Sequence, residues 1–171
     1  MKVVVVGCGR VGALVAENLD ADGHDVLVVD IDTEAFERLP AAFGGRTIRG
    51  DGTDEDVLRN AGATDADFFL AVTEGDNRNV IAAQLAAEVL GARRVVAKVN
   101  DPLRAAAYAE LGIATLCRTN LMADAVHAYL DMPRRYEDGV EVPRGHHPGG
   151  EHHEAPGALG EGIAVPATEE G

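Results

Sequence analysis

Short aliphatic runs alternate along the chain with longer stretches in which apolar residues recur every three or four positions. The aliphatic runs cover residues 2–6, 25–30, 46–50, 67–72, 93–99 and 113–117. Runs of this length between helical patterns are typical of buried strands in a parallel sheet, whose connecting helices cover both faces. The pattern therefore predicts an α/β protein with a Rossmann-like, doubly wound, six-stranded parallel sheet.

Three of the expected helices have an apolar stripe that predicts a buried face. The stripes are Val11, Leu14, Val15 and Leu19 in the first helix, Val80, Ile81, Leu85 and Val89 in the fourth, and Leu121, Met122, Ala125, Val126, Tyr129 and Leu130 in the sixth. The second helix is expected over about 33–43, with Thr33 as its N-cap. The sixth, from about Asn120, fits either packing on the sheet or contact with another subunit, because periodicity does not identify the partner.

The composition changes after Met132 and Pro133. Residues 133–171 contain five prolines and eight glycines and have almost no repeated apolar face. We therefore expect one folded domain over 1–132 and a disordered Gly/Pro/His-rich tail over 133–171. The tail's two histidine pairs, at 146–147 and 152–153, fit a solvated segment better than a metal site, because no scaffold holds them.

The net charge and the cysteine content indicate which classes of partner the protein can bind and in which cellular compartment it is expected. The chain has 15 basic and 29 acidic residues and a formal charge of −14, which opposes attraction to nucleic-acid phosphates or to an anionic membrane surface. Cys8 and Cys117 lie far apart, and no long apolar segment is present. We expect a cytoplasmic, soluble protein that binds no nucleic acid.

The sequence GCGRVG at residues 7–12 follows the first strand and opens the first helix. In this context Gly7 permits a tight turn, Gly9 lets the backbone approach a pyrophosphate, and Gly12 lets the helix pack close to the sheet. Amides at the helix start then face the phosphates. Cys8 is interpreted as a small turn residue, because no histidine or second cysteine lies at redox-motif spacing.

Further candidates lie where predicted strands end. Asp30 can accept hydrogen bonds from both ribose hydroxyls and would repel a 2′-phosphate, so NAD(H), ADP or ATP fit better than NADP. Asp51 could reach an adenine edge or could cap the next helix. Thr73, Glu74 and Lys98 end the fourth and fifth strands, at the edge where open α/β sheets bind ligands.

The ordered series of motifs resembles a known family. VVVVGCGRVG, VLVVDID, RGDGTDEDVL, FLAVTEGDNRNVIAAQLA and VVAKVNDP are similar to the N-terminal nucleotide-binding domain, called RCK or KTN, of the Trk/Ktr potassium-uptake regulators. The resemblance covers residues 1 to about 130. It implies a cytoplasmic regulatory subunit that binds NAD(H) or ATP/ADP. It also implies a homodimer that assembles into a ring under a Trk/Ktr-type potassium-transporting protein, at the inner face of the cell membrane.

The resemblance also implies roles for individual residues. The pyrophosphate would lie against Gly7, Cys8, Gly9, Arg10 and Val11, and Gly12 closes the same motif. Asp30 would bind the ribose, and Asp51 and Gly52 would lie at the adenosine end. The remaining sides of the site would be formed by Thr73, Glu74 and Lys98. Arg10 would contact ligand phosphates, and the sixth helix would form the dimer.

The chain departs from the family pattern at two places. Many members continue into a smaller second ligand-binding domain, whereas only the tail follows here, so some ring contacts are missing or come from a second regulatory chain. Arg118 and Thr119 stand where some ATP-regulated relatives have an acid that holds a cation, so we expect no shared cation. The expected function is non-enzymatic gating. The alternatives are a small NAD-dependent oxidoreductase, or a redox or energy sensor with another partner.

Overall fold

The computed structural model describes residues 1–133 and 140–141. It confirms the predicted parallel sheet, whose six strands are β1 (Lys2–Val6), β2 (Asp25–Asp30), β3 (Arg46–Arg49), β4 (Phe68–Ala71), β5 (Val95–Lys98) and β6 (Ala114–Leu116). These strands follow the order β3-β2-β1-β4-β5-β6, and each neighbouring pair is parallel. The order reverses between β1 and β4, which opens a crevice at their carboxyl ends.

A seventh strand, β7 (Val140–Glu141), pairs antiparallel with β6. It was not predicted, because two residues in a Gly- and Pro-rich stretch show no periodicity. The other residues of the expected tail, 134–139 and 142–171, lie outside the described residues. Both histidine pairs are among them.

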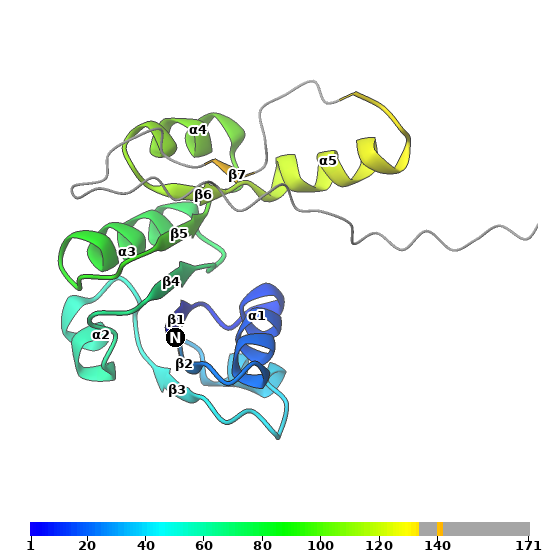
Figure 1. The fold of residues 1–171 in the computed structure, drawn as a ribbon. Helices are drawn as coiled ribbons and strands as arrows, with labels where there is room; N and C mark the ends of the chain where they lie inside the picture. Colours follow the sequence, from blue (N-terminus) through cyan, green and yellow to red (C-terminus); the bar gives the residue numbers. More distant parts are fainter. Residues whose placement is uncertain (134–139, 142–171) are drawn as a thin grey trace, which may run out of the picture.

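Helices cover both faces of the sheet (Figure 1). They are α1 (Arg10–Ala21), the 3₁₀ helix η1 (Thr33–Arg38), α2 (Glu55–Ala61), α3 (Asp76–Glu88), α4 (Pro102–Glu110) and α5 (Arg118–Tyr129). Alternate strand residues point to opposite faces. Val3 and Val26 therefore pack in one core layer with Ala13 and Ala16 of α1. The other layer contains Val4, Leu27 and Phe69 with residues of α2 and α3, among them Leu58 and Ala86.

The apolar stripes predicted for α1 and α3 are partly wrong. In α1 the buried residues are Gly12, Ala13 and Ala16, whereas Val11 and Leu14 are 53% and 57% exposed. In α3, Val80, Ala82, Ala83 and Ala86 are buried, whereas Ile81 and Val89 are exposed. Small residues let each helix approach the sheet closely, so part of the stripe lies outside the contact, although Val15, Leu19 and Leu85 still pack against the core.

Two helix boundaries also differ from the prediction. The segment predicted as a helix over 33–43 is a 3₁₀ helix that ends at Arg38, and its N-cap is Asp32 instead of Thr33. Leu39 precedes a proline and adopts an extended conformation, with φ −78° and ψ 141°, because a residue before proline avoids the helical region. Helix α5 begins at Arg118, slightly before the predicted start.

Candidate functional site

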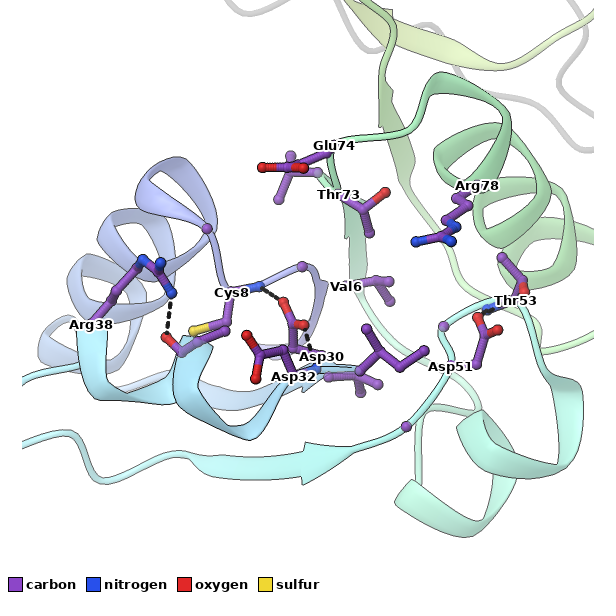
Figure 2. A pocket seen from close by; sticks show the side chains of 18 residues that line it. Val6, Cys8, Asp30, Asp32, Arg38, Asp51, Thr53, Thr73, Glu74 and Arg78 are labelled. Atoms are coloured by element: carbon purple, nitrogen blue, oxygen red, sulfur yellow. Dashed lines mark hydrogen bonds between the residues drawn. The ribbon is translucent and has the colours of Figure 1, made fainter.

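A cavity of about 300 Å³ lies at the carboxyl ends of the central strands, where the strand order reverses. Figure 2 shows it between the turn after β1, the end of β2, the loop after β3 and the start of α3. Eight of the lining residues are candidates from the sequence: Gly7, Cys8, Gly9, Asp30, Asp51, Gly52, Thr73 and Glu74. The lining also contains four polar or charged residues that the sequence did not predict: Asp32, Arg38, Thr53 and Arg78. The crevice therefore brings together eight of the twelve candidates.

The glycine turn forms one wall of the cavity. Gly7 has φ +105°, and a Cβ on it would lie 2.8 Å from the backbone nitrogen of Thr73, so a side chain there would be strained and would meet backbone. A Cβ on Gly9 would meet no atom within 4 Å. Gly9 is also the N-cap of α1 and provides no side-chain cap. The first amides of α1 therefore have no side-chain acceptor, and space is open in front of them.

Asp30 fixes the turn from the end of β2. Its Oδ2 accepts a hydrogen bond from the backbone N–H of Cys8 at 2.6 Å, and its Oδ1 accepts one from that of Asp32 at 2.9 Å. Both carboxylate oxygens keep a free lone pair, so the group can also accept bonds from ligand hydroxyls.

Cys8 is buried within the same turn. Burial, followed by the nearby charge of Asp30, raises the pKa of its thiol. A raised pKa keeps the thiol protonated at neutral pH, and a protonated thiol is a poor nucleophile. The geometry therefore agrees with a small turn residue and gives no support to a reactive thiol.

Asp51 lies in the loop after β3 and is exposed to the cavity. Its Oδ1 accepts hydrogen bonds from the backbone N–H of Thr53 at 2.9 Å and from the Thr53 hydroxyl at 2.8 Å. These two bonds are the main reason that the pKa of the Asp51 carboxyl is lowered, and the charge of Arg78 contributes further. The alternative role as a helix cap is wrong, because Asp54 caps α2.

Thr73, at the end of β4, is held by Asn79 of α3, a residue that the sequence analysis did not single out. Asn79 is completely buried. Its Oδ1 accepts bonds from the backbone N–H and the hydroxyl of Thr73, both at 2.7 Å, and its Nδ2 donates to the carbonyls of Thr73 and Lys98. One amide side chain thus joins the ends of β4 and β5 to the first turns of α3.

Four candidates lie outside the cavity lining: Arg10, Val11, Gly12 and Lys98. Arg10 is the exposed first residue of α1, beside the turn. Lys98 is half-buried at the end of β5. Burial and the nearby Arg118 lower the pKa of its ammonium group, although Asp76 and Glu74 act in the opposite direction.

The sequence contains little that could have identified the four unpredicted lining residues as part of a binding site. Asp32 and Thr53 stand next to motif residues, and their proximity was the one available indication. Arg38 and Arg78 lie within helices, and a charged residue in a helix is usually a solvated one. Only the three-dimensional arrangement shows that these two arginines face the cavity.

Two features of the described residues bear on other kinds of site. That part of the chain has no group of three or more His, Cys, Asp or Glu side chains placed to hold a metal ion. No described helix combines the length and apolar character needed to span a bilayer.

Comparison with known proteins relates this geometry to one family. Residues 3–119 match the family model of the TrkA-N domain. The Trk system potassium uptake protein TrkA of Streptomyces coelicolor is 47% identical over 124 residues, which cover 72% of this chain. The chain spans only 56% of that relative's length.

Solved structures confirm the fold. The TrkA-N domain of the inner membrane protein YbaL from Escherichia coli superposes with a TM-score of 0.67 at 19% identity, covering 75% of this chain and 96% of that one. The Kef C-terminal domain of Shewanella denitrificans, in its AMP-bound form, gives a TM-score of 0.61 at 23% identity, with 75% and 78% covered.

Proposed function

The chain belongs to the TrkA-N domain family, and from that premise we propose that it is a nucleotide-binding regulatory domain of a potassium uptake system. The observation that carries the proposal is the open space at Gly9, in front of the uncapped first turn of α1. Backbone N–H groups at a helix start, with no side chain in the way, form a binding site for phosphate groups.

The rest of the cavity fits an adenosine nucleotide. Asp30 has lone pairs free for ribose hydroxyls, and Asp32 adds a second carboxylate beside it. Two carboxylates at this end repel a 2′-phosphate, which favours NAD(H), ADP or ATP over NADP. Asp51 and Gly52 lie on the side toward β3, where the base would lie. The Kef domain of Shewanella denitrificans contains AMP in the solved structure, and we extend adenosine binding to this chain.

Arg10 is assigned to the phosphates. It stands at the first position of α1, where a cation is unfavourable next to the positive end of the helix dipole unless an anion binds there. Its exposed side chain can turn toward a terminal phosphate at the glycine turn. Lys98 lies at the end of β5, outside the cavity lining, and would approach only a ligand that extends past Thr73 and Glu74.

Regulation follows from unequal binding. A nucleotide shifts a conformational equilibrium only by the difference between its affinities for the two states. We propose that this difference, transmitted through a homodimer within a larger ring, changes the open population of a Trk/Ktr-type membrane transporter. A second regulatory chain could complete the ring. The domain would then act at the inner face of the cell membrane through its partner.

A hydride-transferring enzyme fits the cavity less well. Such an enzyme needs a proton donor beside the nicotinamide. Over the described residues, the ionisable groups that line the cavity are carboxylates, two arginines and the protonated thiol of Cys8. None of these is the tyrosine, lysine or histidine that usually donates the proton to a carbonyl substrate.

The first experiment is calorimetric titration of the purified chain with ADP, ATP, NAD⁺, NADH and NADPH. We expect binding of at least one adenosine nucleotide, and NADPH should bind at least about tenfold more weakly than NADH, from which it differs by the 2′-phosphate. Failure of every nucleotide to bind would refute the proposal. Co-purification with a potassium-transporting membrane protein then tests the partner, and detectable hydride transfer to a carbonyl substrate would favour the enzyme.

A further inference from the structure

Arg78 projects into the cavity from an element that the sequence motifs do not include. It is the third residue of α3 and lines the cavity. Figure 2 shows its guanidinium group directed toward Thr73 and the loop that contains Asp51 and Thr53. Its stem bends back over the start of the helix, and a Cβ placed on Gly75 would lie 3.6 Å from its Cγ. The side chain therefore enters the cavity from the side of α3.

The guanidinium group of Arg78 has no hydrogen bond or ion pair within the described residues. Other arginines are held in place: Arg38 donates to the carbonyl of Ala35, Arg59 to Glu55, and Arg104 is 3.9 Å from Asp76. A cation in the first turn of a helix is disfavoured by the helix dipole, and no side chain caps α3. Arg78 thus leaves five donors and a planar face for a ligand.

The backbone that positions Arg78 is rigidly held. The next residue, Asn79, is completely buried and makes four hydrogen bonds to the ends of β4 and β5. Two residues before Arg78, the carboxylate of Asp76 accepts bonds from the backbone and side-chain amides of Asn100, both at 3.0 Å. The start of α3 is therefore anchored on both sides of Arg78, whose own side chain has no such bond within the described residues.

The position of Arg78 identifies the part of the ligand that it faces. The proposed phosphate site lies at Gly9, across the cavity on α1, and Asp30 marks the ribose. Arg78 lies instead on the side of the loop after β3, close enough to Asp51 to lower the pKa of its carboxyl. The group that fits between this loop and α3 is the nucleobase.

We propose that Arg78 stacks its guanidinium plane on the purine base of the bound nucleotide and holds the base against the loop of Asp51 and Thr53. A guanidinium group stacks well on an aromatic face and loses this contact when replaced by lysine. The inference rests on the proposed nucleotide site and adds Arg78 to it as a residue that recognises the purine base. It requires no contact between Arg78 and the phosphates.

The test compares Arg78→Gln and Arg78→Lys with the unaltered chain in titrations with AMP, ADP and ATP. Arg93→Gln is the matched control, because Arg93 pairs with Asp67 near the opposite end of the sheet. Arg78→Gln should weaken all three nucleotides by the same factor, roughly three- to thirty-fold, and Arg78→Lys should recover little. The control should bind as the unaltered chain does.

Three outcomes would overturn the inference. A loss that grows from AMP to ATP would place Arg78 on the phosphates, and unchanged affinity would remove it from the site. If the unaltered chain bound no nucleotide, the proposed function would fail as well. Thermal unfolding without ligand should be the same for both Arg78 variants and the unaltered chain, because the Arg78 side chain is exposed and unpaired within the described residues.

Discussion

Gly7 and Gly9 are two residues apart in one turn, but the structure constrains them in opposite ways. Gly7 needs a positive φ, and its Cβ would contact backbone of the β4 end, whereas Gly9 has open space around it. Gly7→Ala should therefore lower the free energy of unfolding by roughly 1–3 kcal/mol, and Gly9→Ala should change it little. Urea denaturation measures both.

The same pair separates folding from binding. A methyl group on Gly9 would occupy the space proposed for phosphates, so Gly9→Ala should weaken ADP binding at least about tenfold in calorimetry although the protein stays folded. Equal affinity of Gly9→Ala and the unaltered chain would show that phosphates bind elsewhere. A stability loss as large as that of Gly7→Ala would show that Gly9 has a structural role.

Asn79 is a buried polar residue that holds Thr73, which lines the cavity, and the end of β5 in place. Asn79→Ala would leave the backbone N–H of Thr73 and the carbonyl of Lys98 without this partner. Each buried group left unpaired costs about 1–3 kcal/mol, so we expect a loss of at least about 2 kcal/mol in urea denaturation. Gln84→Ala, at an exposed position of the same helix, is the control. A loss no greater than that of the control would contradict this role.

At the scale of the helices, the N-termini fall into two groups. Asp32, Asp54 and Asp101 cap η1, α2 and α4 with side-chain hydrogen bonds, whereas α1 and α3 begin at glycines that provide none. Helix α5, which begins after Cys117, has no side-chain cap either. The cavity lining includes Gly9, the N-cap of α1, and Arg78 of α3, and also Ala35 and Arg38 of the capped helix η1. The capped helices gain stability from their own sequence, whereas α1 and α3, which border the cavity, have N-cap glycines that provide no side-chain acceptor for the first amides of these two helices.

Asp54→Ala tests this division. The Asp54 carboxylate accepts bonds from the amides of Asp56 and Val57, and loss of such a cap costs about 1 kcal/mol. Unfolding in urea should show this loss, and nucleotide affinity should not change because α2 contributes no residue to the cavity lining. Asp56→Asn removes a first-turn charge but keeps the cap, so it should cost less. An equal cost for both would mean that charge, and not the cap, stabilises α2.

The sequence predicted the parts of the fold whose signals are local. Val-rich strands, GCGRVG and the acid at Asp30 depend on neighbours in sequence, and the strands follow the prediction. Of the candidates in these motifs, Gly7, Cys8, Gly9 and Asp30 line the cavity, whereas Arg10, Val11 and Gly12 do not. The predicted stripes of α1 and α3 were wrong at Val11, Leu14, Ile81 and Val89, because close contact with a sheet selects small residues over large ones. Asn79 and Arg78 could not be recognised, since their roles depend on strand ends and a loop distant in sequence.

At the scale of the whole molecule, α5 is an element with little buried surface within the described residues. Asn120 is its single buried residue, and Figure 1 shows the helix extending away from the sheet. Met122, Val126 and Tyr129, which recur at helical spacing, are 63%, 52% and 72% exposed. Isolated apolar side chains on a surface are ordinary, but a continuous stripe on one helix usually marks an interface.

This stripe supports the proposed homodimer, in which α5 packs against a second copy of the chain. A lysine at its centre would have to be desolvated in such an interface, so Val126→Lys should convert the dimer into a monomer in light scattering. Leu103→Lys is the matched control, because Leu103 is 84% exposed on α4, and it should leave the mass unchanged. A monomeric unaltered chain, or a Val126→Lys protein that remains dimeric, would assign the stripe to another partner.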